Sequence, residues 1–143
     1  YLDETNIRMT MNFRNNFSRL AQELIKENKH KKAEQVLDYC MLTMPSKKVP
    51  LNYFIHPIIE SYYVVNSIKK GSNLASDLAK KYTAELDYYF SFPKAKIPGV
   101  QMEILKNLQF FNQLVEISLE NNHPDSNIMQ QDFEKFYRQF LIL

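Results

Sequence analysis

The stretch "NFRNNFSRLAQELIKENKHKKAEQVLDYCMLTMP" (residues 12–45) decides the fold class. Its apolar residues recur three or four positions apart, which is the spacing of one face of an α-helix. They are Phe13, Phe17, Leu20, Ala21, Leu24 and Ile25, and then Ala33, Val36, Leu37, Cys40, Met41 and Met44. The polar run "KENKHKK" (residues 26–32) separates the two sets, and Pro45 ends the second because proline cannot continue a helix. The stretch therefore predicts an antiparallel helical hairpin, which we expect to span about residues 5–45.

This hairpin also matches the spacing of the tetratricopeptide repeat, in which large and small residues alternate at fixed positions on two helices. Ala21 and Ala33 are small where the two helix axes would approach each other, and large residues surround them. The matching residues are Phe17, Leu20, Ala21, Leu24, Ala33, Leu37 and Pro45. The spacing is kept, while several identities of the signature are replaced by similar residues.

Two further hairpins follow from the same helical spacing. The second, about residues 50–92, has a first helix from about Leu51 to Ser67 and a turn at "KKGS" (residues 69–72). "FPKAKIPGV" (residues 92–100) separates the third, about residues 98–142. In this last hairpin we expect Asp125 or Ser126 to cap the final helix.

The expected architecture is all-α: a single domain over residues 1–143, in which three antiparallel hairpins stack as a short, irregular tetratricopeptide-like superhelix. The length suits one domain. Only two glycines are present, Gly71 and Gly99, which excludes a glycine-rich phosphate loop. A net charge of +2 is too small to predict nucleic-acid binding. No apolar run is long enough to cross a membrane.

The sequence predicts no catalytic residue, metal site or cofactor. Cys40 is the single cysteine and lies on the apolar face of its helix, where a small buried hydrophobe is the expected role. The three histidines, His30, His56 and His123, do not form the pairs that zinc binding requires. We therefore expect the fragment not to be an enzyme.

Polar residues with helical spacing predict a binding groove instead. The first helices of the first two hairpins each carry such a stripe, and first helices line the concave surface of a superhelix. The groove residues are Asn12, Asn15, Arg19, Gln22, His56, Glu60 and Tyr63. A merely solvated face is the alternative. Pro57 leaves open whether the helix of "PLNYFIHPIIESYY" (residues 50–63) begins near Phe54 or bends there.

Five stretches carry a resemblance to a known family: "YLDETNIRM", "NNFSRLAQELI", "VLDYCMLTMP", "VPLNYF" and "ELDYYFSFP", all within residues 1–93. They resemble the soluble C-terminal, tetratricopeptide-like region of multi-spanning Bacteroidetes membrane proteins of unknown function, which are related to protein O-mannosyltransferases. The chain begins with Tyr1 in mid-pattern, so we expect a fragment of such a protein. No catalytic residue is carried over, because the family's catalytic part would lie in its membrane region.

The resemblance implies a non-catalytic interaction or scaffold module attached to a membrane-embedded glycosyltransferase. Its expected partner is another protein or a segment of the parent chain, and no nucleic acid. The alternative is an accessory domain that holds a glycan or a lipid-linked acceptor, for which exposed tyrosines would provide stacking surfaces. The periplasmic side of the membrane is expected, with the cytoplasmic side left open.

Overall fold

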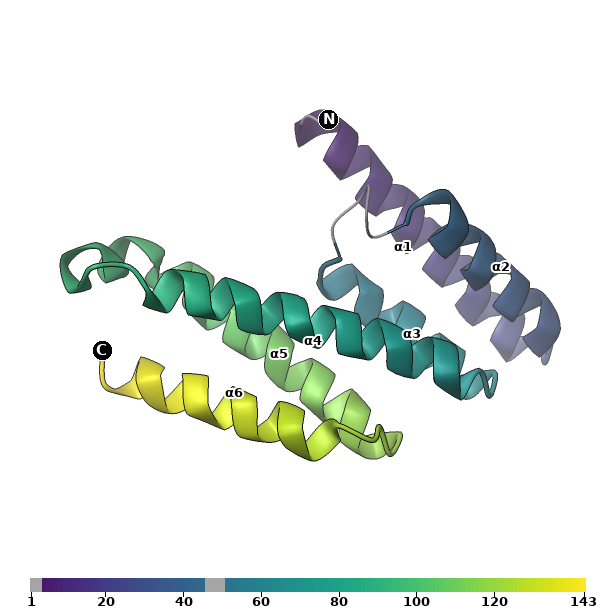
Figure 1. The fold of residues 1–143 in the computed structure, drawn as a ribbon. Helices are drawn as coiled ribbons and strands as arrows, with labels where there is room; N and C mark the ends of the chain where they lie inside the picture. Colours follow the sequence, from purple (N-terminus) through teal and green to yellow (C-terminus); the bar gives the residue numbers. More distant parts are fainter. Residues whose placement is uncertain (1–3, 46–50) are drawn as a thin grey trace. The chain divides into compact units, whose positions relative to one another are not determined.

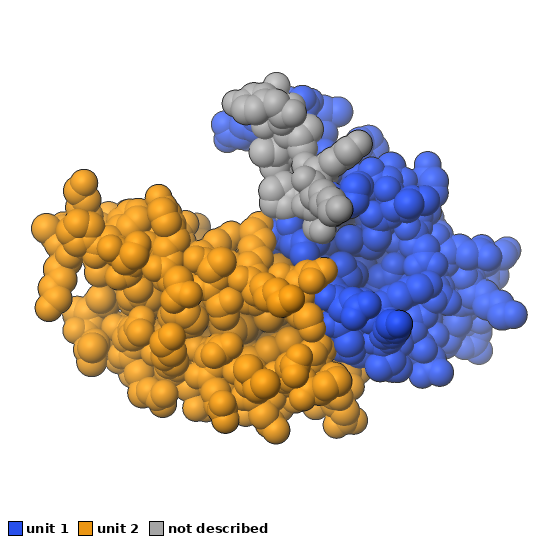
Figure 2. Space-filling model, viewed as in Figure 1, with its two compact units in different colours: residues 1–74 blue, residues 75–143 orange. Residues whose placement is uncertain are grey.

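The computed structural model describes residues 4–45 and 51–143, apart from the side chain of Ile7. Within these residues the chain is all-α, as predicted, and contains no strand. Figure 1 shows the helices: α1 (Glu4–Lys26), α2 (His30–Thr43), α3 (His56–Val64), α4 (Ile68–Phe90), α5 (Gln101–Glu120) and α6 (Ser126–Leu141), with two 3-10 helices, η1 (Tyr53–Ile55) and η2 (Lys94–Val100). The chain forms two compact units, residues 1–74 and 75–143 (Figure 2). The residues of α4 belong to both units, because the division falls after Leu74.

In the first unit, α1 packs side by side against α2, and it also packs against α3 (Figure 1). Ala21 and Ala33 are completely buried, together with Leu37 and Cys40 of α2. Alanine lets two helices approach closely, because its side chain ends at Cβ. The prediction of a first hairpin with buried small residues is therefore confirmed.

The buried face of α1 differs from the predicted one. Phe13 and Leu20 were expected in the core, but their side chains are 54% and 48% exposed. Arg14 and Ser18 are buried in their place. These two residues and Ala21 follow the i, i+4, i+7 spacing of one helix face, so the helix turns this narrower face inward. The consequence is that large apolar side chains of α1 are left on the surface.

The three helix-to-helix turns share one geometry, each with an asparagine in the left-handed backbone region. Asn28, Asn66 and Asn122 have φ values of 62°, 65° and 57°. In each turn the asparagine N–H and the next N–H donate to carbonyls three and five residues earlier, as in the turn where Asn66 donates to Tyr63 and Ser67 to Tyr62. This is the Schellman motif, and asparagine tolerates it better than other residues with side chains.

The predicted turn at "KKGS" is therefore wrong, because these residues lie inside α4. Gly71 has no positive φ and serves packing rather than turning. A Cβ atom at this position would lie 3.4 Å from the Ile59 carbonyl oxygen, from the Tyr62 Cβ and from the Tyr63 Cε1. The absence of a side chain thus lets the start of α4 approach α3 closely.

The structure answers the question that Pro57 raised. Asn52 caps the 3-10 turn η1, its side-chain oxygen accepting a hydrogen bond of 3.0 Å from the Phe54 N–H. The α-helix α3 then begins at His56, which places Pro57 in its first turn. No N–H in the first turn has a partner within the helix, so proline costs nothing there and no bend is needed.

The second unit consists of the later part of α4 with η2, α5 and α6. α5 packs against α6, and the rings of Tyr82 in α4 and Phe111 in α5 lie 5.8 Å apart. The helix expected from about residue 98 begins instead at Gln101, because residues 94–100 form η2.

The expected cap of α6 by Asp125 or Ser126 is also wrong. Asp125 occupies the N-cap position, but no side chain there accepts a hydrogen bond from an N–H of the first helical turn. His123 acts there instead: its Nδ1 accepts a hydrogen bond of 2.9 Å from the Asp125 N–H. Its Nε2 lies 2.9 Å from the Ser76 hydroxyl of α4. An Nδ1 that accepts leaves the proton on Nε2, so the ring donates to Ser76. This buried histidine therefore ties α4 to the turn between α5 and α6.

Candidate functional site

The predicted groove residues of α1 do lie on its surface. Asn12, Arg19 and Gln22 are exposed, and Asn15 is half-buried. Their three- and four-residue spacing keeps them on one side of the helix, next to the exposed apolar residues. This part of the predicted stripe is available to a partner.

The α3 part of the predicted stripe does not form. His56 and Tyr63 are buried, and of the three α3 residues only Glu60 is exposed. The Tyr63 hydroxyl lies 2.9 Å from the Ser72 hydroxyl at the start of α4, so it holds two helices together. On α3 the helical spacing therefore predicted an exposed stripe wrongly, because His56 and Tyr63 are buried and Tyr63 pairs with α4.

Arg14 is the residue of α1 that the sequence reasoning missed. It is completely buried, and its guanidinium donates a 2.8 Å hydrogen bond to the Met44 carbonyl just after α2 ends. Burial lowers its pKa from the ordinary arginine value, while the nearby Cys40 acts in the opposite direction. One sequence feature could have indicated that this face is buried. Arg14 lies on the same helix face as the small residues Ser18 and Ala21, and small residues allow a neighbouring helix to approach closely.

Because the face of α1 that contains Arg14 is buried, large apolar side chains of the α1–α2 hairpin are exposed to solvent. We call this surface the apolar face, and its exposed members are Met9, Phe13, Leu20, Tyr39 and Leu42. The half-buried Phe17 ring joins the two helices within it, lying 5.6 Å from the Tyr39 ring. Leu42 is 81% exposed, an unusual position for a leucine. Exposed apolar side chains gathered on one hairpin are a common feature of interaction sites.

A polar network connects α2 to the turn between α3 and α4. It consists of Glu34, Asp38, Tyr62, Ser67 and Lys70. The Lys70 ammonium lies 2.8 Å from a carboxylate oxygen of Glu34 and 2.8 Å from one of Asp38. The Tyr62 hydroxyl donates to Asp38 over 2.9 Å, and the Ser67 hydroxyl donates to Glu34.

The electrostatics of this network favour fixed charges over proton transfer. Hydrogen bonds from Lys70 and then Ser67 hold the pKa of Glu34 below its ordinary value. Hydrogen bonds to Asp38 and Glu34 raise the pKa of Lys70. Burial, followed by the Asp38 hydrogen bond, raises the pKa of Tyr62 far above its ordinary value. The shifts of Glu34, Tyr62 and Lys70 each stabilise the form present at neutral pH, which suits a network that joins helices.

Cys40 is not set up as a nucleophile. It is completely buried, and burial raises the pKa of its thiol to about 11, although Arg14 opposes this shift. A reactive cysteine needs a lowered pKa and access to solvent. Among the residues that the structure describes, no group of three or more His, Cys, Asp and Glu side chains is arranged to hold a metal ion.

In the described part of the chain, no helix has both the length and the apolar character needed to cross a membrane. Comparison of the chain with protein-family models, with curated proteins and with solved structures found no match.

Proposed function

We propose that this chain is a non-catalytic helical module that binds an amphipathic helix of a partner protein, or of its own parent chain. The observation that carries the proposal is the apolar face of α1 and α2. Two neighbouring helices with exposed apolar side chains offer a surface against which the apolar face of an amphipathic helix can pack. Phe13, Phe17 and Tyr39 would supply the aromatic contacts that usually dominate such binding.

The arrangement of the first unit supports a repeat architecture. α1 neighbours both α2 and α3, which is how the first helix of a tetratricopeptide hairpin meets its own second helix and the next hairpin. Buried Ala21 and Ala33 fit the same pattern. The stack of three hairpins is part of this proposal, as is the parent protein, a membrane glycosyltransferase of the family that residues 1–93 resemble.

Polar residues beside the apolar face would give the binding its specificity. Arg19 and Gln22 are exposed on α1, the helix that carries part of the apolar face, and Glu60 is exposed on the neighbouring helix α3. Rim residues of this kind contribute little affinity when exposed, but they select partners by charge. Substitutions in the apolar face and substitutions of these polar residues should weaken binding to different extents, so each set is tested in its own variant.

The test compares partner capture by three variants of the full chain. Membrane-extract proteins are captured on the wild type, identified, and then re-expressed for quantitative binding. Phe13→Ser/Leu42→Ser should weaken binding of the purified partner at least tenfold, because it removes two exposed apolar contacts of about 1 kcal/mol or more each. Ile128→Ser is the matched control, since Ile128 is also an exposed apolar residue but lies on α6.

Arg19→Ala/Glu60→Ala tests the polar residues, and a smaller loss is expected for it. Circular dichroism must show the same helix content in all variants. Equal binding by the wild type and by Phe13→Ser/Leu42→Ser would refute the assignment of the apolar face.

A glycan-binding accessory role is the second candidate, favoured by one exposed aromatic pair. The rings of Tyr53 and Phe54 are stacked with centroids 4.4 Å apart, and Tyr53 is exposed. Stacking on Phe54 holds the Tyr53 ring in place, so that a sugar face can rest on it at low entropic cost. Titration with neutral oligosaccharides tests this candidate, with Tyr53→Ala as the variant and Tyr137→Ala as the matched control, since Tyr137 is also exposed and stacked, on Phe133, but lies on α6. Absence of any response at millimolar ligand excludes it.

A further inference from the structure

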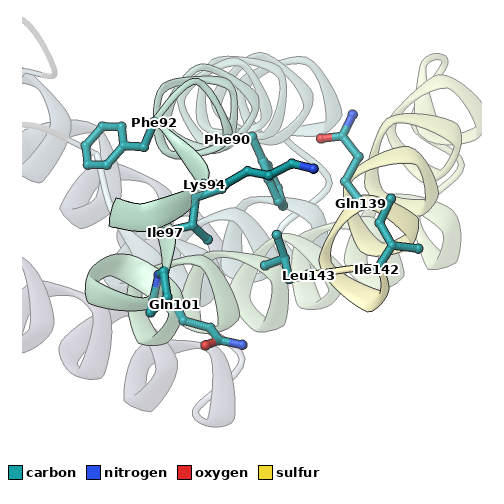
Figure 3. Close-up of a pocket in the computed structure, with 9 residues that line it drawn as sticks. Phe90, Phe92, Lys94, Ile97, Gln101, Gln139, Ile142 and Leu143 are labelled. Carbon is teal, nitrogen blue, oxygen red and sulfur yellow. The ribbon is translucent and has the colours of Figure 1, made fainter.

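The second unit contains an open pocket of about 660 Å³ that the proposed partner binding does not use. It lies where the end of α4, the 3-10 helix η2, the start of α5 and the end of α6 come together (Figure 3). The lining residues are Phe90, Phe92, Lys94, Ile97, Pro98 and Gln101, with Gln139, Ile142 and Leu143 from the last helix. Its volume falls within the range of small-molecule sites.

The segment "PKAKIPG", part of an apparent linker in the sequence, builds one wall of this pocket. Pro93 precedes η2, and its carbonyl accepts a 2.8 Å hydrogen bond from the Lys96 N–H. The resulting 3-10 turn buries Ile97 and lets the Lys94 side chain extend across the pocket in the view of Figure 3. Opposite this wall, Phe90 is held by stacking on Phe136, with ring centroids 6.1 Å apart.

The pocket combines a mostly apolar lining with one ionisable side chain. Lys94 is that side chain, and the carboxylate of the terminal residue Leu143 makes no ion pair with it among the described residues. Among the described residues, no ion pair or hydrogen bond is found for the Lys94 ammonium. Ile142 is 85% exposed, so its apolar surface faces solvent unless a ligand covers it. A ligand that would use both features has a sizeable apolar body and one negative charge.

We propose that this pocket binds a single-chain amphipathic carboxylate. The hydrocarbon part would lie against Phe90, Ile97 and Ile142, and the carboxylate would accept hydrogen bonds from Lys94. The amides of Gln101 and Gln139 offer further N–H donors at the pocket wall. An uncharged alkyl chain would make no ion pair with Lys94, which is exposed, and a free inorganic anion would leave the apolar lining uncovered.

The test titrates the isotope-labelled chain with dodecanoate below its micelle concentration, using NMR for location and calorimetry for affinity. Backbone amide shifts confined to the lining residues are expected. Dodecanol and dodecylamine carry the same chain without the negative charge, and both should bind at least threefold more weakly. Binding of dodecanoate should also weaken with added salt, because the ion pair is screened.

Two pairs of variants make the test specific. Lys94→Gln should weaken dodecanoate binding about three- to fivefold, the loss expected for a partly exposed ion pair. Lys96→Gln should not, because Lys96 lies in the same 3-10 helix but does not line the pocket. Ile142→Asp should abolish binding, because it places a negative charge where the ligand lies. Leu141→Asp is its control, since Leu141 is also exposed but lies outside the lining.

These substitutions are on exposed residues, so folding is expected to be kept, and the amide spectrum of each variant checks this. Equal affinity for dodecanoate and dodecanol, or equal binding by the wild type and Lys94→Gln, would overturn the proposed role of Lys94. Absence of shifts at the lining residues at millimolar dodecanoate would overturn the site itself.

Discussion

Substitution of Gly71 by alanine tests whether the chain reverses at Asn66, as the structure has it, or at "KKGS", as the sequence suggested. Glycine inside a helix is less favourable than alanine by about 0.5–1 kcal/mol. The new Cβ would meet three atoms at 3.4 Å, the near edge of ordinary contact, so the gain is slightly reduced. We expect Gly71→Ala to raise the free energy of unfolding by about 0.5 kcal/mol. Gly71→Leu should lower it by about 1–3 kcal/mol, because nothing larger than Cβ fits.

Substitution of Asn66 by alanine should change the free energy of unfolding in the opposite direction to Gly71→Ala. With φ at 65°, a residue with a side chain other than Asn or Asp costs about 1–2 kcal/mol in this conformation. Asn66→Ala is therefore expected to destabilise the protein by about 1 kcal/mol, while Asn66→Gly should be neutral or stabilising.

Urea unfolding followed by far-UV circular dichroism measures these differences. With a slope of about 2 kcal/mol per molar urea, a change of 0.5 kcal/mol shifts the midpoint by about 0.25 M. Ala84→Gly is the matched control, because Ala84 is exposed on the same helix and reports helix propensity alone. A loss of 1 kcal/mol or more for Gly71→Ala, together with no loss for Asn66→Ala, would refute the reasoning.

Three further predictions concern titratable groups. Glu34→Gln should cost about 0.5–1 kcal/mol at neutral pH, since the Lys70 pair is partly exposed. The pKa of Glu34 is lowered in the folded state, so the stability difference between the wild type and Glu34→Gln should shrink as the pH falls below about 4. Denaturation at several pH values measures this difference, and a difference that grows with falling pH would contradict the prediction. Alkylation of Cys40 at mildly alkaline pH should be on the order of a hundredfold slower in the native chain than in urea, whereas equal rates would mean an exposed thiol. His123→Ala should lower the free energy of unfolding by about 1–3 kcal/mol, because it leaves the Asp125 N–H and the Ser76 hydroxyl without this partner; an unchanged thermal midpoint would exclude the link.

The sequence by itself determined the helices. Three- and four-residue spacing of apolar side chains depends only on the geometry of the α-helix, so it predicted an all-α chain and the first hairpin. It also placed Ala21, Ala33 and Leu37 correctly in the core. The turn between the helices of the second hairpin was predicted wrongly, because both glycine and asparagine can adopt the left-handed backbone conformation that such a turn requires. Glycine is the usual turn former, but asparagine forms the turn at Asn66 and Gly71 lies within α4.

Only the tertiary structure decided which helix face is buried. Apolar content alone favoured the face with Phe13 and Leu20, yet Arg14 lies inside because Met44 supplies a carbonyl acceptor 2.8 Å away. That acceptor is 30 residues distant in the sequence, so no local pattern predicts it. The same holds for Tyr63, a predicted groove residue that pairs with Ser72 once α4 packs on α3. Both candidate sites depend on tertiary packing. On α1, Arg14 is buried and Phe13 is exposed, and the pocket is lined by residues that the ends of α4 and α6 and the 3-10 helix η2 bring together.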